Sequence, residues 1–369
     1  MTTQPITFAR RLHPDPVPEA TRTGILADPG FGTHFTDHMV KIDWAGDVVQ
    51  GSGQWRDPRI EPYGPLALDP AAAVLHYGQE IFEGLKAYRH ADGSLWGFRP
   101  EMNAARLNRS ARRLALPELP EEVFLAALRE LVAVDGHWVP DGEGASLYLR
   151  PFMIATEAFL GVRPARQVLF SVIASPAGNY FGGPVKPVDI WLSRDWARAG
   201  RGGTGAAKCG GNYAASLIAQ IEGESHGCQQ VMFLDRDRGD AVEELGGMNV
   251  FFVHDDGTLV TPELTGTILE GVTRSSIIQL AQDRGMTVEE RRFTLDEWRE
   301  GWRSGRITEA FACGTAAVIT PIGRLVAEDG TIGDEGARPG EVTMDIRKQL
   351  LEIQTGHAED PHGWLTRLA

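Results

Sequence analysis

The spacing of apolar positions predicts a chain in which helices and strands alternate. Apolar residues recur at helical spacing from Pro100 and again after Pro120, and a proline in the first turn of a helix costs no hydrogen bond. Runs of apolar, β-branched and aromatic residues at 146–155 and 167–175 predict strands. Residues 1–70 are rich in Gly, Pro and Asp, so we expect an irregular arm followed by short strands there.

A cluster of Gly and Pro from Pro176 to Pro187 interrupts this pattern and predicts an interdomain linker. We place an N-terminal α/β domain at 1–177, the linker at 178–188 and a C-terminal α/β domain at 189–369. The pattern of the second half predicts a strand at 188–193, a helix with Ala215, Ile218 and Ile221 on one side, a strand at 229–235, a hairpin across 249–261 and a helix that ends at Gly285. Because the rhythm is not strictly βαβ, it favours a mixed α/β (α+β) fold over a doubly wound parallel sheet.

Charge and cysteine content narrow the class of protein. The 369 residues carry 50 acidic and 36 basic side chains, for a net charge of −14. Such a surface repels phosphate backbones and anionic lipid, so nucleic acid and membrane are not expected as partners. The cysteines, Cys209, Cys228 and Cys313, are odd in number and form no Cys-x-x-Cys motif, which favours a reducing compartment. No segment reads as a secretory signal or a membrane span, and we expect a cytoplasmic protein.

The segment around Lys208 is the first candidate for chemistry. Gly200–Gly205 matches the dinucleotide pattern Gly-x-Gly-x-x-Gly only formally, because the residues around it do not predict a strand before and a helix directly after. The plain alternative is a flexible loop with an exposed lysine. However, the following residues, CGGNY at 209–213, surround the lysine with small side chains. Burial of that kind lowers the pKa of a lysine and favours a Schiff base with an aldehyde, while Tyr213 would hydrogen-bond an oxygen on a flat ring.

Two adjacent glutamates, Glu243 and Glu244, stand among apolar residues in the segment VEELGGMN at 242–249. Paired glutamates are common in solvated turns, which is one interpretation. In apolar surroundings a carboxylate would instead keep a pyridine nitrogen protonated, which is what a pyridoxal cofactor requires.

Two further segments predict anion sites. LEGVTR at 269–274 precedes a predicted helix, and unpaired amides at a helix start bind phosphate, although Thr273 would equally serve as the helix cap. FACGTAA at 311–317 predicts a small-residue turn in which the Thr315 hydroxyl holds an anion, or a tight turn that enters a buried helix. His34 and His38 lie four residues apart, but no His-Glu-x-x-His motif is present and we expect no metal.

These segments, in this order, resemble those of the branched-chain amino acid aminotransferases, which are fold type IV enzymes that use pyridoxal 5'-phosphate. The resemblance runs from about His76 to the C-terminus and also covers HYGQEIFEGLKAY at 76–88, FRP to Arg106 and YLRP at 148–151. It implies a two-domain fold with the cofactor at the domain interface. It also implies reversible transfer of the amino group of L-leucine, L-isoleucine or L-valine to 2-oxoglutarate, which gives L-glutamate.

The resemblance assigns roles residue by residue. It implies that Lys208 carries the cofactor and moves the proton, that Glu244 faces the ring nitrogen and that Tyr213 faces the ring oxygen. The phosphate is then bound by Arg106, the amides of Val272 and Thr273, and Thr315. The substrate is bound by Phe82, Tyr148 and Tyr213 with Tyr77 nearby, by amides around Thr315 and Ala316, and by Arg150, which also meets the distal carboxylate of glutamate.

A homodimer is implied as well, because Leu160 and Val162 match a loop that crosses into the neighbouring subunit's site in relatives. Two departures from the family pattern limit the comparison. Ala317 and Thr320 stand where some relatives have a Cys-x-x-Cys redox pair, and Gly247 replaces a hydroxyl-bearing residue of some relatives.

Two alternatives stay open. A D-amino acid aminotransferase or an aminodeoxychorismate lyase would share the fold, although the chain length, the N-terminal arm and YGQEIFEGLKAY favour the branched-chain group. A cofactor-free binding protein, in which Gly200–Tyr213 is only a loop, is the alternative from a different class.

Overall fold

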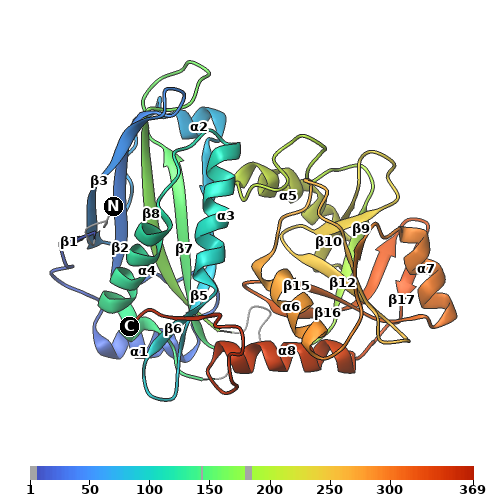
Figure 1. Ribbon diagram of the computed structural model, residues 1–369. Coiled ribbons are helices and arrows are strands. Elements are labelled where there is room, and N and C mark those ends of the chain that lie inside the picture. Colours follow the sequence, from blue (N-terminus) through green and yellow to red (C-terminus); the bar gives the residue numbers. More distant parts are fainter. Residues whose placement is uncertain (1–5, 143, 179–184) are drawn as a thin grey trace. The chain divides into compact units, whose positions relative to one another are not determined.

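The computed structural model describes residues 6–142, 144–178 and 185–369, and the chain divides into two compact units (Figure 1). Unit 1 comprises Met1–Gly182, Ala207–Gly210 and Ile353–Ala369, and unit 2 comprises Gly183–Ala206 and Gly211–Glu352. The predicted linker at 178–188 includes residues 179–184, which lie outside the described residues. The predicted domain boundaries therefore stay a prediction.

Unit 1 is built on a sheet of nine strands among the described residues. All its pairs are antiparallel except the parallel pair of β1 with β3. In pairing order the strands are β1 (Ala9–Arg10), β3 (Ser52–Pro62), β2 (His38–Asp47), β8 (Gln167–Ala177), β7 (Ser146–Ala155), β5 (Leu85–Arg89), β6 (Leu95–Phe98) and β18 (Leu365–Arg367), with β4 (Glu80–Phe82) paired to β7.

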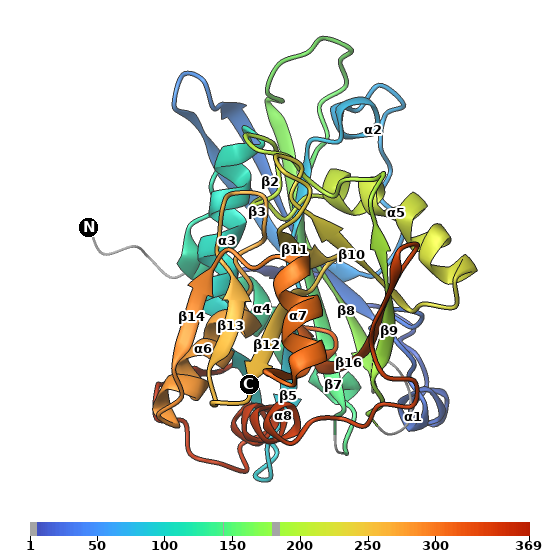
Figure 2. The ribbon, with the colours of Figure 1, turned by 90° about the vertical axis from the view of Figure 1, so that its right-hand side faces the viewer.

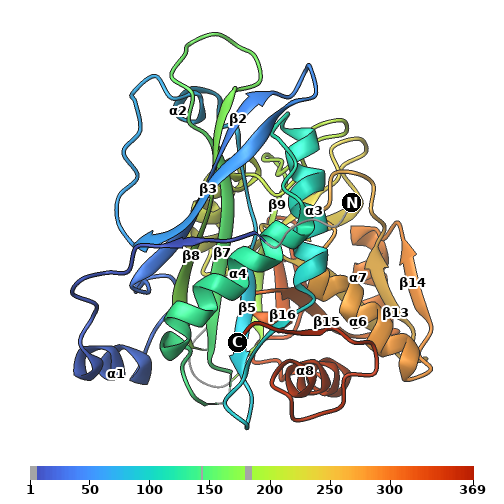
Figure 3. The ribbon, with the colours of Figure 1, turned by 60° about the vertical axis from the view of Figure 1, so that its left-hand side comes forward.

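The helices of unit 1 are α1 (Glu19–Ala27), α2 (Ala73–Tyr77), α3 (Pro100–Arg113) and α4 (Glu121–Asp135), followed by a 3-10 turn at Gly136–Trp138. The two predicted helices of this half are confirmed as α3 and α4, which pack against each other and against the sheet (Figure 3). Their apolar stripes, with Leu107 on α3 and Phe124 and Leu128 on α4, are buried in the core of the unit. The side chains of α3 outside its apolar stripe do not pack into this core, so they can take part in a functional site.

The predicted strand at 146–155 is confirmed as β7, and the strand predicted at 167–175 continues two residues further, to Ala177. The extension follows from pairing, because Ser146 at the start of β7 lies opposite Ala177. Pro176 cannot donate a hydrogen bond, but its fixed φ is compatible with an extended chain.

Unit 2 contains a second sheet of nine strands among the described residues, with both parallel and antiparallel pairs. Figure 2 shows β14, β13 and β12 side by side in this sheet. In pairing order the strands are β11 (Val242–Leu245), β10 (Gln230–Leu234), β9 (Val188–Ser193), β16 (Val318–Ala327), β15 (Ile307–Gly314), β12 (Asn249–His254), β13 (Leu259–Pro262) and β14 (Val288–Arg291), with β17 (Gly330–Gly333) paired to β16.

The helices that lie wholly or mostly in unit 2 are α5 (Gly210–Ser225), α6 (Val272–Asp283), α7 (Leu295–Ser304) and α8 (Glu341–Gln354). The predicted strand at 188–193 is β9, the predicted hairpin is β12 with β13, and Gly285 takes the left-handed conformation just after α6. The expected mixed α/β class is therefore confirmed. No helix among the described residues is both long and apolar enough to cross a membrane.

Helix α5 carries the predicted apolar side, but that side is not covered by unit 2. The helix packs through Ala219 and Gly223, and a Cβ atom at Gly223 would lie 2.9 Å from Val231. Ile218 and Ile221 are 46% and 62% exposed, and Leu217 beside them is 61% exposed. A stripe of large apolar side chains therefore faces away from its own unit.

His38 is a core residue of unit 1, whereas His34 is exposed. The His38 ring accepts a hydrogen bond at Nε2 from the His13 amide, at 2.8 Å, and its Nδ1 lies 2.7 Å from Asp135 Oδ1. The His38 amide donates to the other oxygen of Asp135 at 2.9 Å. The imidazole is thus held as the tautomer with its proton on Nδ1, which fixes the N-terminal arm to the sheet.

We expect Asp135→Ala to lower the free energy of unfolding by about 2–3 kcal/mol, because it leaves two buried donors of His38 without a partner. Glu130→Ala is the control, since the ion pair of Glu130 with Arg10 is exposed and we expect it to contribute at most about 1 kcal/mol. Urea unfolding of both variants measures the difference. Equal effects would contradict the assignment.

Candidate active site

Lys208 belongs to unit 1, where three backbone contacts fix the segment that carries it. The Phe82 amide on β4 donates to the Lys208 carbonyl at 2.9 Å, and the Lys208 amide donates to Ser110 Oγ on α3 at 2.9 Å. The Gly210 amide donates to the carboxylate of Glu80. Hydrogen bonds therefore fix the lysine segment to both β4 and α3, which argues against the alternative of a flexible loop with an exposed lysine.

Aromatic rings and a guanidinium surround the Lys208 amine. Its Nζ lies 4.7 Å from the ring centre of Phe82. Arg150 lies over the same ring at 4.7 Å and over Tyr148 at 5.3 Å, and its Nη2 donates to Tyr148 Oη at 3.1 Å. A Cβ atom at Gly84 would collide with the Tyr148 hydroxyl, so glycine is required there. The structure thus brings together four of the predicted site residues.

A buried ion pair lies next to this group. Arg106 Nε and Nη2 donate to the two carboxylate oxygens of Glu83 at 2.8 and 2.7 Å, and Asn103 Nδ2 donates to Glu83 at 2.7 Å. The Glu83 side chain is fully buried. The sequence reasoning missed Glu83, although an acidic residue inside the apolar segment IFEGL was the available signal.

This charge arrangement acts on the lysine. Burial of the ammonium group, followed by the positive charge of Arg106, lowers the pKa of Lys208 from 10.5 to about 8, and Glu83 opposes the shift. The residue as a whole is half-buried, but protein atoms enclose its ammonium end, and it is that end which titrates. At pH 7 about one amine in ten is then neutral and able to act as a nucleophile.

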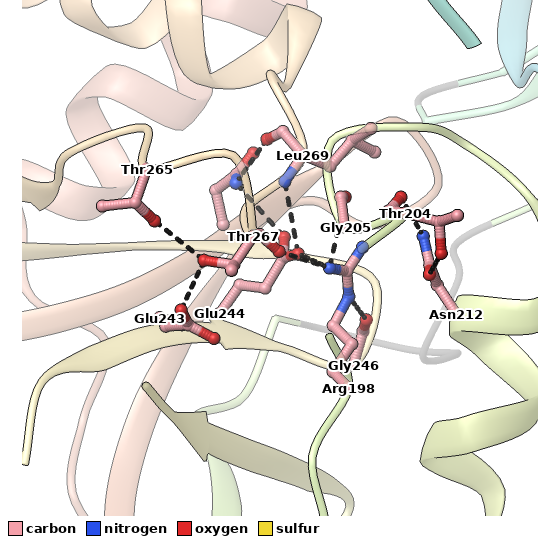
Figure 4. Close-up of polar contacts among 11 residues, drawn as sticks. Arg198, Thr204, Gly205, Asn212, Glu243, Glu244, Gly246, Thr265, Thr267 and Leu269 are labelled. Atoms are coloured by element: carbon pink, nitrogen blue, oxygen red, sulfur yellow. Dashed lines mark hydrogen bonds and ion pairs between the residues drawn. The ribbon is translucent and has the colours of Figure 1, made fainter. Parts of the chain in front are cut away.

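In unit 2 the paired glutamates lie in strand β11, where both are buried, so the solvated-turn interpretation is wrong. Neighbouring side chains of a strand point to opposite faces, and the two carboxylates have different partners. Thr267 donates its hydroxyl to Glu243, and burial raises the pKa of Glu243. Glu244 instead lies 2.5 Å from Nη1 of Arg198 (Figure 4).

The segments EELGGMN and LEGVTR meet at the Glu244 carboxylate. The Leu269 amide donates to its Oε1 at 3.3 Å, and Asn249 Nδ2 lies 3.4 Å from its Oε2 and 3.0 Å from the Leu269 carbonyl, to which it donates. A Cβ atom at Gly271 would collide with the Asn249 side chain. Glu244 and Leu269, which are 25 residues apart, therefore bring these two segments into direct contact.

Tyr213 lies in the first turn of α5, against the turn that follows β11. A Cβ atom at Gly247 would lie 3.1 Å from Tyr213 Cε1, so a larger residue would crowd the ring. Asn212 beside it donates to the Thr204 carbonyl at 2.8 Å, which closes the Gly-rich segment onto α5 (Figure 4). That segment does not open a helix directly, which agrees with its rejection as a dinucleotide loop.

Helix α6 begins at Val272, after Gly271, and no side chain caps it. Thr273 lies within the first turn, so the alternative in which Thr273 is the cap is wrong. The amides of Val272 and Thr273 stand at the positive end of the helix, as phosphate binding requires.

The ACGTAA segment joins β15 to β16, so the interpretation as an entry to a buried helix is wrong. Thr315 and Ala316 lie in the turn of this hairpin. Val318, just after it, has φ of +62°, which is costly for a β-branched residue and is found where the surrounding structure imposes the turn.

Tyr77 lies with the predicted intersubunit loop. Its hydroxyl donates to the Leu160 carbonyl at 2.5 Å, and the side chains of Leu160 and Val162 are exposed. Tyr77 is therefore tied to that loop, whereas Phe82, Tyr148 and the lysine form a separate group of contacts.

Comparison with known proteins agrees with this geometry. The family model for amino-transferase class IV matches residues 80–325. A branched-chain-amino-acid aminotransferase of Mycolicibacterium smegmatis is 56% identical over 372 residues and one of Mycobacterium tuberculosis is 54% identical over 374, each with 100% of both chains covered. The crystal structure of the Escherichia coli branched-chain amino acid aminotransferase superposes with a TM-score of 0.73 at 30% identity, and covers 84% of this chain and 97% of its own.

The branched-chain amino acid aminotransferase of T.th., solved with pyridoxamine 5'-phosphate, superposes with a TM-score of 0.70 at 31% identity. It covers 89% of this chain and 98% of its own. The chain therefore belongs to the class IV aminotransferases, a family of transaminases that use pyridoxal phosphate.

We expect Lys208 in the cofactor-free protein to be acylated with a pH midpoint near 8, measured by competitive labelling and mass spectrometry with the exposed Lys348 as internal reference. Arg106→Met should raise the midpoint, because it removes a nearby positive charge, and Glu83→Gln should lower it. A midpoint that stays above pH 10 would show that the amine is not held as described.

Proposed function

We propose that the protein is a branched-chain amino acid aminotransferase that exchanges the amino groups of L-leucine, L-isoleucine and L-valine with 2-oxoglutarate. The observation that carries this proposal is the Lys208 amine of lowered pKa, packed against Phe82 in the same cluster as Arg150. Support also comes from relatives that bear this name and align with the whole chain. The reaction is reversible, so the same residues serve both directions.

Each of the two units offers groups that suit pyridoxal 5'-phosphate. An amine that is partly neutral at pH 7 suits its aldehyde, and a buried carboxylate beside a guanidinium suits its ring nitrogen. The start of α6, which no side chain caps, suits its phosphate. When bound, the group supplies an electron sink for the charge that develops at the substrate Cα.

The residues of the chain then have distinct tasks. Lys208 would anchor the cofactor covalently, and its amine would hold and move the proton at the substrate Cα. Glu244 would accept a hydrogen bond from the ring nitrogen, and Tyr213 would donate one to the ring oxygen. The phosphate-binding groups are Arg106, the amides of Val272 and Thr273, and Thr315.

Substrate recognition has to accept a branched apolar side chain and the side chain of glutamate in turn. Phe82 and Tyr148 offer aromatic faces to the first, and Arg150, which lies over both rings, offers its guanidinium to the distal carboxylate of the second. The amides around Thr315 and Ala316 bind the carboxylate on the substrate Cα. Tyr77 acts together with the Leu160–Val162 loop to which it is hydrogen-bonded.

We also propose a homodimer, which two exposed apolar features support. Leu160 and Val162 project from unit 1, and the α5 stripe of Leu217, Ile218 and Ile221 projects from unit 2. A stripe of this kind buries itself against its own copy about a two-fold axis. We also place the protein in the cytoplasm, because Cys209, Cys228 and Cys313 are free and buried thiols.

We expect the purified protein to form glutamate from 2-oxoglutarate with L-leucine as donor, and to do so far faster than with D-alanine. Arg150→Met should lower kcat/KM for 2-oxoglutarate about 10–100-fold and for the branched 2-oxoacid much less, because only the former carries a second carboxylate. Arg129→Met, a change at an exposed arginine of unit 1, is the control. Preference for D-alanine, or equal losses with both oxoacids, would contradict the assignment.

We expect light scattering to give a mass twice that of the 40.3 kDa chain, and Ile221→Asp to shift the protein toward the monomer by placing a charge in the α5 stripe. Val49→Asp makes the same change at an exposed valine outside the stripe and should leave the mass unchanged. A parent protein with the mass of a monomer would contradict the proposed homodimer.

A further inference from the structure

Arg198 lies where several segments of unit 2 meet, and it is not part of any of the motifs that led to the site. We propose that Arg198 is the positioning residue for Glu244. It keeps the Glu244 carboxylate ionised and fixes it relative to the Gly-rich segment and to the loop before α6. The proposal rests on the proposed function, because it concerns the residue assigned to the ring nitrogen.

The contacts of the Arg198 guanidinium carry the argument (Figure 4). Its Nη1 lies 2.5 Å from Glu244 Oε1 and donates to the carbonyl of Thr267 at 2.9 Å. Further bonds run from Nη1 to the Gly205 carbonyl at 3.4 Å and from Nε to the Gly246 carbonyl at 2.9 Å. One side chain thus joins the Gly-rich segment, strand β11 with its turn, and the loop before α6.

Burial makes the charge of Arg198 necessary. The side chains of Arg198 and Glu244 are each 2% exposed. An isolated carboxylate at such a place takes up a proton, because burial disfavours the charged form, whereas arginine stays charged throughout the accessible pH range. Paired with Arg198, Glu244 stays a carboxylate, and only a carboxylate can balance a protonated ring nitrogen.

Three other described groups near Glu244 carry no positive charge. Asn249 and the Leu269 amide are neutral donors. The charge of Cys313 would also interact with Glu244, but burial raises the pKa of that thiol far above its ordinary value, so it stays neutral. Glu243 on the same strand is acidic, and its carboxylate accepts a hydrogen bond from Thr267.

The same guanidinium that keeps Glu244 ionised also fixes the position of the Glu244 carboxylate. A Cβ atom at Gly205 would collide with the backbone of Thr267, so these two segments lie in direct contact where Arg198 binds both carbonyls. Thr267 leads to Leu269, whose amide returns to Glu244. Arg198, the 267–269 segment and Glu244 therefore form a closed ring of contacts, and Gly205 stands three residues before Lys208.

Charge and geometry can be separated by substitution. A lysine at position 198 would keep the positive charge but would lose the planar fork that reaches several acceptors at once. A methionine would lose both. If Arg198 acts as proposed, Arg198→Lys should retain the protonation state of the site and lose part of the affinity, whereas Arg198→Met should lose both properties.

The experiment measures two quantities for each variant: the dissociation constant of pyridoxal phosphate from the cofactor-depleted protein, and the pH midpoint of the visible absorption of the bound cofactor. Arg198→Met should raise the dissociation constant about 10–100-fold and shift the midpoint by about one pH unit or more. Arg198→Lys should shift the midpoint much less than Arg198→Met does. Arg194→Met, at an arginine that pairs with Asp329 at the surface, is the matched control and should change neither.

A double-mutant cycle with Glu244→Gln tests whether Arg198 acts through that carboxylate. In the Glu244→Gln protein, Arg198→Met should raise the dissociation constant by a smaller factor than in the parent protein, because the ion pair is already lost and only the contacts with the backbone carbonyls remain to be removed. The same loss in both backgrounds, or an equal midpoint shift with lysine and methionine, would overturn the proposal and leave Arg198 a residue of the fold. A parent protein that binds no pyridoxal phosphate would instead overturn the proposed function itself.

Discussion

The residues that surround Lys208 in unit 1 depend on one interaction, the buried ion pair of Glu83 with Arg106. Burial of the ammonium group lowers the pKa of Lys208 most, Arg106 lowers it further and Glu83 opposes the shift, which leaves the amine with a pKa of about 8. Without Glu83 the guanidinium would be a buried charge with no carboxylate across its Nε and Nη2 donors. Without Arg106 the amine would be more basic and less often neutral. Unit 2 also contains a buried pair of a carboxylate and a guanidinium, Glu244 with Arg198.

Local patterns predicted the helices and most of the strands between Pro100 and Gly285, because apolar spacing and turn residues report directly on which face of an element is buried. In residues 1–70, where we expected an irregular arm and short strands, the structure has helix α1 and the long strands β2 and β3. Strands β7 and β9 begin and end where the sequence placed them, and α3 opens at Pro100. The end of β8 was missed because it is set by pairing with β7. The α5 stripe predicted the helix, yet it faces away from unit 2, since periodicity reports an apolar face and not what covers it.

Some residues of the candidate site could be recognised from short motifs, whereas others are defined only by contacts between residues far apart in the sequence. Lys208, Glu244 and Tyr213 stand in short motifs that could be recognised in the sequence, and family resemblance supplied their roles. Glu83 and Arg198 could not be found in that way, because each matters through a partner more than twenty residues distant. Nor could the sequence show that Tyr77 is hydrogen-bonded to the Leu160 loop, a contact across 83 residues.

The most direct test of the central claim is to add pyridoxal phosphate, reduce the protein with borohydride and locate the modified residue by peptide mass spectrometry. We expect a single stable adduct on Lys208, the lysine held between β4 and α3. An adduct on the buried Lys86, on Lys41, which pairs with Glu61, or on the exposed Lys348 would contradict it.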